Sequence, residues 1–149
     1  MLSQTGLYAL QALLHLAEQG EGAQSTAATM ARVLVIPGTY LAKVLQRLAR
    51  EGILDATRGA RGGYRLAVDP ARLTVANVVA PFQELRARET CLLGGVCDVD
   101  HPCSAHARRV AWNEAALEIL EHTTLADLLS GAPLGPPLSA VTTPSENDR

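Results

Sequence analysis

The chain has 149 residues, of which 48% are hydrophobic, and a formal net charge of −2, a composition that fits one domain of ordinary size. Such a chain folds without disulfides, and three cysteines cannot all pair, so a disulfide framework is excluded. No apolar run approaches the roughly 18 residues that cross a bilayer and no leader segment opens the chain, so we expect a cytoplasmic protein with no membrane partner.

Charge is unevenly distributed along the chain. Residues 1–72 hold eight Lys and Arg against five Asp and Glu, a net +3, whereas residues 73–149 hold five against ten, a net −5. A basic N-terminal half indicates contact with phosphate groups, and the acidic C-terminal half indicates a different role.

Three helices are predicted at the start of the chain. Residues 3–18 have apolar residues at helical spacing and are followed by glycines, which end the helix. A shorter helix is predicted from the cap Ser25 to about residue 33. After a Pro-Gly turn, Thr39 is predicted to cap a third helix that ends near Gly52.

The third helix has two distinct faces. A core stripe is predicted at Leu41, Val44, Leu45 and Leu48, and a polar face at Tyr40, Lys43, Arg47 and Arg50. A cationic helix that follows a helix and a tight turn is typical of a helix-turn-helix DNA reader.

Residues 53–68 are predicted to form two short strands around a glycine-rich loop at Gly59–Gly63. Three arginines surround this loop, so it is predicted to be a basic wing that reaches phosphates or a minor groove. The predicted contacts with double-stranded DNA are Thr39, Tyr40, Lys43, Arg47, Arg50, Arg58, Arg61 and Arg65. The alternative is a solvated hairpin whose arginines only aid solubility.

Three further helices are predicted after the wing. A short helix runs from Thr74 to about Pro81, and a long one, capped by Ser104, reaches about His122. Capping-box spacing at Thr124 opens a terminal helix that closes at residue 131. The long helix has a wider apolar surface than one neighbour needs, which indicates a homodimer, although packing on its own domain alone is the alternative. These apolar residues are Val110, Trp112, Ala116, Leu117, Ile119 and Leu120.

All three cysteines lie in one stretch, together with two of the four histidines. Thiolates favour iron-sulfur clusters, zinc or copper(I), and His106 follows Cys103 by three residues, so both side chains can face one centre. We therefore expect a two-iron or four-iron cluster on Cys91, Cys97, Cys103 and His106, with His101 as the competing fourth ligand.

Three alternatives use the same residues. The first is a structural Cys3His zinc site, although the usual close Cys pairing is absent. The second is a metal-free thiol switch. The third is an iron-sulfur enzyme or electron carrier, against which the sequence offers no phosphate-binding glycine motif, catalytic triad or paired carboxylates. We expect neither enzymatic activity nor a small-molecule substrate.

Four motifs in this order resemble the Rrf family of bacterial winged-helix regulators over residues 1 to about 130. They are Thr5-Gly-Leu-Tyr-Ala-Leu-Gln-Ala-Leu, Tyr40-Leu-Ala-Lys-Val-Leu-Gln-Arg-Leu, Arg58-Gly-Ala-Arg-Gly-Gly-Tyr and the Cys-x5-Cys-x5-Cys-x2-His spacing. The resemblance implies a homodimeric transcription factor whose long helix crosses its partner and whose cluster lies near the dimer interface and the DNA-binding units.

The sequence departs from the family pattern at two places. The family wing usually reads Arg-Gly-Pro-Gly-Gly-Gly-Tyr, whereas Ala60 and Arg61 replace Pro-Gly here, and Arg58 still matches the wing arginine of the relatives. Nitric-oxide-sensing members complete the cluster with an acidic residue of the first helix, and the matching position here is Leu7, which cannot bind iron. This departure favours His106 as the fourth ligand of the cluster, because His106 matches a ligand position of the family.

The sequence therefore predicts a mainly α fold with a small β-hairpin wing, a winged helix-turn-helix with a long dimerisation helix. The predicted units are the DNA-binding domain (1–80), the cysteine-rich cluster loop (81–104), the dimerisation and terminal helices (105–131) and a disordered tail (132–149). The predicted function is a transcriptional regulator that senses redox, oxygen, nitric oxide or iron-sulfur status, because ordering the loop around a cluster would set the spacing of two recognition helices.

Overall fold

The computed structural model describes residues 2–59, 62–85, 100 and 104–131. The helices are α1 (Gln4–Glu18), α2 (Ala27–Leu34), α3 (Gly38–Arg50), α4 (Val75–Val79), α5 (Ser104–His122) and α6 (Leu125–Ser130), with a 3₁₀ turn η1 (Pro70–Arg72) and the strands β1 (Leu54–Thr57) and β2 (Gly63–Leu66). The strands pair in antiparallel register, with Leu54 opposite Leu66. The mainly helical fold with one hairpin, predicted from the sequence, is confirmed.

The starts of three helices differ from the prediction, and one of them is α5, which already includes Ser104, the residue predicted to cap it. Thr26, not Ser25, caps α2, because its hydroxyl accepts the N–H of Thr29 at 3.1 Å. Ser25 is instead buried and pairs its backbone with that of Tyr64. Thr39 lies inside α3 and caps nothing: the helix begins at Gly38, with Pro37 in the cap position and no capping side chain.

The core forms where α1, α2 and β1 pack around α3, and α4 packs against α1. Its fully buried large side chains are Leu13, Leu16, Met30, Leu41, Leu45, Leu48, Val78, Val79 and Leu125. The predicted inner stripe of α3 is confirmed, since Val44 is also buried. Each such side chain contributes about 1.5–3 kcal/mol when it is removed from water, so the stripe determines which side of α3 faces inward.

The hairpin turn depends on two glycines. Gly59 has a φ of +106°, which favours glycine, and its carbonyl accepts the N–H of Gly62 at 2.8 Å. A Cβ on Gly62 would lie 2.3 Å from the carbonyl oxygen of Thr57, so no larger residue fits without a shift of the backbone. These contacts fold the chain back after β1 and place Arg58 at the turn.

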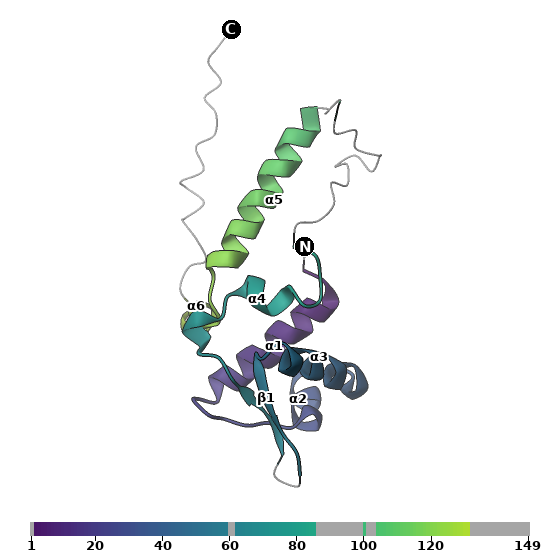
Figure 1. Ribbon diagram of the computed structural model, residues 1–149, viewed down its shortest axis with the longest axis vertical. Helices are drawn as coiled ribbons and strands as arrows, with labels where there is room; N and C mark the ends of the chain where they lie inside the picture. The colour runs from purple at the N-terminus through teal and green to yellow at the C-terminus, as the bar shows by residue number, and fades with distance from the viewer. Residues whose placement is uncertain (1, 60–61, 86–99, 101–103, 132–149) are drawn as a thin grey trace.

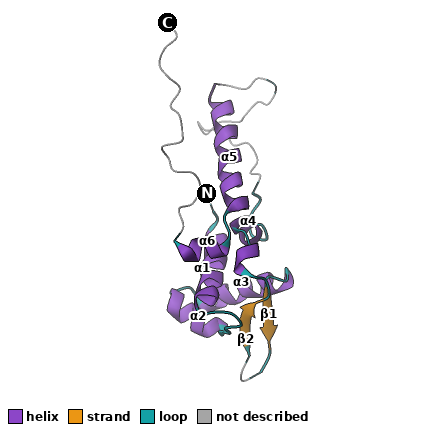
Figure 2. Cartoon of the chain, turned by 90° about the vertical axis from the view of Figure 1, so that its left-hand side faces the viewer, coloured by secondary structure: helices purple, strands orange, loops and turns teal. Residues whose placement is uncertain are grey.

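α5 extends away from the helical body, whereas the hairpin projects from the opposite end (Figures 1 and 2). Two backbone hydrogen bonds of 2.8 Å hold the connection between α5 and α6 to the start of α4: Val75 N–H donates to the carbonyl of Thr123, and Leu125 N–H donates to the carbonyl of Leu73. None of the 19 residues of α5 is buried. The helix is thus attached at its C-terminal end, and the other described residues leave most of its surface uncovered.

The predicted capping box of α6 is confirmed. The Thr124 hydroxyl accepts the N–H of Asp127 at 3.1 Å, and the Asp127 carboxylate accepts from the Thr124 hydroxyl and backbone N–H. These hydrogen bonds lower the pKa of Asp127 below its ordinary value of 3.8, with the side-chain bond making the larger contribution. The helix ends at Gly131, as predicted, and Gly131 adopts the left-handed conformation.

Several predicted features lie outside the described residues. They are most of the cysteine loop (86–99 and 101–103), residues 60–61 of the wing and the tail after residue 131. Among the helices that the structure describes, none is long and apolar enough to cross a membrane.

Val35, in the turn between α2 and α3, has φ and ψ of 55° and 43°, a left-handed conformation that a β-branched residue rarely adopts. This conformation costs about 1–2 kcal/mol. Val35 is 88% exposed, so removing its side chain loses little packing energy. We expect Val35→Gly to raise the free energy of unfolding by about 0.5–1 kcal/mol after the entropic cost of glycine. Urea unfolding measures the change.

Val33 offers the matched control, since it is also exposed but lies within α2. Val33→Gly is expected to lower the free energy of unfolding, because glycine weakens a helix interior. A loss of stability in Val35→Gly would show that the left-handed valine is not a source of strain.

Candidate nucleic-acid interface

The outward face of α3 is a row of polar side chains. Thr39, Lys43, Gln46 and Arg50 follow one another at intervals of four, three and four residues, and all four are exposed. The sequence prediction included this row except Gln46. Its spacing from Lys43 and Arg50 could have identified it, because residues three and four apart share a helix face.

Tyr40 lies on the flank of α3 and contacts α1. Its hydroxyl hydrogen-bonds the side chain of Thr5, and its ring meets that of Tyr8 edge-on, with 5.7 Å between the centroids. Tyr40 remains 39% exposed, but these contacts fix its position. The structure therefore makes Tyr40 a residue that positions α3 against α1.

A groove of about 570 Å³ separates α3 from the hairpin. α3 contributes Gln46 and Arg50 to its lining, the hairpin contributes Arg58, and the start of α2 contributes Thr26. In Figure 2 the hairpin lies beside the helical body and extends beyond it. α3 and the hairpin that follows it in sequence thus place two arginines and an amide around one concave surface.

Two of the predicted arginines are neutralised by neighbouring carboxylates. Arg65 donates from Nε and Nη2 to one oxygen of Asp55, at 3.1 and 3.0 Å, across the two strands. Arg47 pairs with Glu51 at 3.0 Å along α3. Both pairs are about half exposed, so each contributes less than about 1 kcal/mol to stability.

Three other predicted cations have no compensating carboxylate among the described residues. Lys43, Arg50 and Arg58 form no salt bridge with any residue in the described ranges. Arg61 lies outside the described residues. The positive potential therefore concentrates on the outward row of α3 and the start of the hairpin turn, which is where a phosphate backbone would approach.

The predicted cluster ligands are described only in part. Cys91, Cys97, Cys103 and the competing His101 lie outside the described residues. His106 lies in the first turns of α5 and is partly exposed. Within the described part of the chain, no three His, Cys, Asp or Glu side chains form a group that could hold a metal ion.

Three helices followed by an antiparallel hairpin, with a cationic third helix beside that hairpin, define a winged helix-turn-helix DNA-binding protein. Residues 2–131 match the Rrf2 family, described as iron-dependent transcriptional regulators. The chain belongs to this family, which confirms the resemblance that its motifs indicated.

Two relatives and one solved structure specify the similarity. The chain is 32% identical over 124 residues to the transcriptional regulator NsrR of Geobacillus kaustophilus, covering 82% of this chain and 84% of that protein. It is 28% identical over 129 residues to IscR of Klebsiella pneumoniae, covering 87% and 79%. The structure of CymR, the global cysteine regulator of B. subtilis, superposes with a TM-score of 0.73 at 26% identity, covering 88% of this chain and 97% of that one. The chain is thus a transcriptional regulator and not an enzyme.

Proposed function

We propose that this regulator binds operator DNA as a homodimer and that an iron-sulfur cluster on Cys91, Cys97, Cys103 and His106 sets its affinity for that DNA. The observation that most supports DNA contact at this site is the groove beside α3, where Arg50 and Arg58 are exposed and have no carboxylate partner in the part of the chain that the structure describes.

In the proposed complex α3 enters the major groove. Lys43 and Arg50 supply cations to guanine edges or phosphates, and Gln46 can make two hydrogen bonds to an adenine. Arg58 reaches a phosphate or the minor groove from the hairpin. The remaining members of the proposed contact set are Thr39, Tyr40, Arg47, Arg61 and Arg65.

We assign smaller direct contributions to three of these residues. Tyr40 is tied to Thr5 and Tyr8 and acts by positioning α3. Arg47 and Arg65 must release a carboxylate before they bind a phosphate with full charge. The carboxylates beside these two arginines also repel the DNA backbone, which lowers the gain further.

The donor set fits an iron-sulfur cluster. Three thiolates and one imidazole suit a two-iron or four-iron centre, and a family described as iron-dependent favours iron over a structural zinc ion. When bound, the cluster supplies a centre that changes with the oxidant and iron supply of its surroundings. The zinc site and the metal-free thiol switch are the alternatives that the test below separates.

The chain itself offers a route from the cysteine loop to the DNA-contacting elements. α5 begins at Ser104, directly after the loop, and its other end is hydrogen-bonded to the Leu73–Val75 segment, which follows the hairpin closely in sequence. A displacement of α5 would therefore be transmitted to the base of the hairpin. A coupling free energy of about 1–3 kcal/mol suffices to change operator affinity by about 5-fold to 150-fold.

The surface of α5 supports a homodimer. Trp112 and Ile119, one heptad apart, are 56% and 47% exposed, and both line a groove of about 330 Å³ between α5 and the segment after α4. The Nε of Arg109 is buried without a hydrogen-bond partner among the described residues, and its guanidinium lies 5.3 Å from the Trp112 ring centroid. A second α5 would cover the apolar face.

We accordingly propose a DNA-binding unit (1–80), a cluster loop (81–104) and a dimerisation unit (105–131), with a tail at 132–149.

The DNA assignment is tested with a fragment that the wild-type protein selects from genomic DNA. Replacing both Lys43 and Arg58 by Ala should weaken binding. It should also reduce the steepness of the plot of the logarithm of the binding constant against the logarithm of the salt concentration, by a slope of about 0.9 for each phosphate that the variant no longer neutralises. Arg65→Ala should have a smaller effect, because Asp55 already neutralises that arginine. The exposed changes should alter stability by no more than about 0.5 kcal/mol. Gel-shift titrations at several salt concentrations measure these effects.

Arg72→Ala is the matched control, since Arg72 is an exposed cation on η1 outside the groove. It should bind DNA as the wild type does. Wild-type affinity in the Lys43/Arg58 double variant, or binding that salt does not weaken, would contradict the assignment.

The dimer is tested by charge on the uncovered face of α5. Ile119→Glu should convert a micromolar dimer to a folded monomer, because a carboxylate would be buried without a partner in the interface but exposed in the single chain. Sedimentation velocity measures the mass. Glu114→Lys changes the charge of an exposed residue of α5 about 140° around the helix and should remain dimeric. A wild-type monomer, or an Ile119→Glu dimer, would refute this interface.

The cluster is tested by anaerobic purification followed by absorbance, iron, sulfide and zinc analysis. Alanine at Cys91, Cys97 or Cys103 should abolish the chromophore and change operator affinity, whereas His106→Ala should leave a cluster that dissociates more easily. His15→Ala, on α1, is the histidine control. Stoichiometric zinc in the wild type, or equal operator affinity of the loaded and cluster-free protein, would overturn the sensing mechanism.

A further inference from the structure

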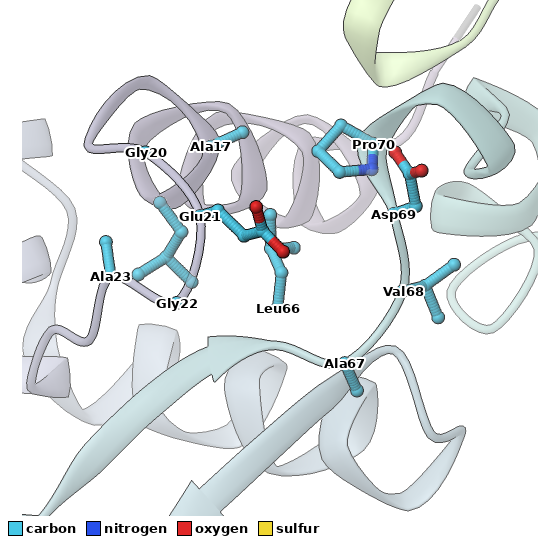
Figure 3. Close-up of a pocket in the computed structure, with 11 residues that line it drawn as sticks. Ala17, Gly20, Glu21, Gly22, Ala23, Leu66, Ala67, Val68, Asp69 and Pro70 are labelled. Carbon is cyan, nitrogen blue, oxygen red and sulfur yellow. The ribbon is translucent and has the colours of Figure 1, made fainter.

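A third concavity lies between the end of α1, the loop that leads to α2 and the segment after β2 (Figure 3). Its volume is about 450 Å³, and it shares no lining residue with the groove beside α3. Much of its wall is apolar, formed by Leu16, Ala17, Leu66, Val68 and Pro70. Small-molecule sites in proteins typically have volumes of about 300–1,000 Å³ and mostly apolar walls with a few polar groups. The cavity has this size and this character.

The ionisable side chains that line the cavity are two carboxylates, Glu21 and Asp69. Neither forms a salt bridge within the described ranges. One oxygen of Asp69 accepts the N–H of Ala71 at 2.8 Å, which fixes the carboxylate at the rim of the cavity. Glu21 extends from the loop toward the wall at Leu66 (Figure 3). Two negative charges without a cation among the lining residues favour a positively charged ligand and oppose an anion.

We propose that this cavity binds a small organic cation, an ammonium or guanidinium group on an apolar body. The apolar body lies against Leu66 and Val68, and the cationic group lies between Glu21 and Asp69. The site is distinct from the DNA-contacting face and from the cysteine loop, and it gives the regulator a ligand class that neither of them binds. Binding is measured without DNA, so its outcome does not depend on the proposed function.

The test uses three probes of similar shape that differ in charge: 2-phenylethylammonium, 2-phenylethanol and 3-phenylpropanoate. Each is titrated into the isotope-labelled full chain and followed by NMR. The ammonium should bind with a Kd of about 1 mM or tighter, and about fivefold more tightly than the alcohol, since exposed ion pairs contribute modestly. The propanoate should bind more weakly than either. Shifts should concentrate at the backbone amides of Gly20, Gly22 and Ala67, which line the cavity.

Matched variants separate the site from non-specific attraction. The Glu21→Gln/Asp69→Asn double variant should bind ammonium and alcohol equally, and the new Asn side chain can still accept from Ala71 N–H. Glu18→Gln removes a nearby exposed carboxylate that does not line the cavity and should keep the fivefold preference. Ala17→Phe should fill the cavity and weaken binding of all three probes.

Three outcomes would overturn the proposal: equal binding of the three probes to the wild type, an unchanged preference in the double variant, or shifts that concentrate away from the cavity. The double variant decides the question even if Ala17→Phe does not fold.

Discussion

The burial of the inner stripe of α3 is the constraint on which the rest of the structure depends. Leu41, Leu45 and Leu48 are inaccessible to solvent because α1, α2 and β1 pack around them. A helix whose apolar stripe is held in this way cannot rotate, so Lys43 and Arg50 must face outward. The cationic surface is therefore a consequence of core packing, and its stability does not depend on the charged side chains themselves.

Two short backbone pairings position the other elements relative to this core. Ser25 and Tyr64 exchange hydrogen bonds of 3.0 and 2.8 Å, which hold the hairpin beside the start of α2. The bonds between Leu73–Val75 and Thr123–Leu125 hold the end of α5 beside α4. Both pairings satisfy backbone groups that would otherwise lack partners.

The carboxylates near the interface divide its cations into two kinds. Asp55 and Glu51 compensate Arg65 and Arg47 at the edges of the surface, whereas its centre has no acidic side chain among the residues that line the groove beside α3. Such an arrangement focuses positive potential on a narrow strip instead of spreading it over the whole protein, whose formal net charge is −2. A weakly acidic protein can thus present a basic surface to DNA while the rest of the protein surface repels DNA.

The sequence by itself determined the helices, the hairpin, the inner stripe of α3 and the capping box of α6, because helical periodicity, glycine turns and caps are local properties. It also determined the family, through the order of four motifs, and the Arg47–Glu51 pair could have been inferred from a spacing of four residues. Only the tertiary structure decided that Arg65 is neutralised, that Tyr40 is tied to α1 and that Ser25 pairs with the hairpin. These facts depend on strand register and on contacts between distant segments, which no local pattern encodes. For the same reason the cavity at Glu21 and Asp69 became visible only when the chain was folded, since its walls come from segments more than forty residues apart.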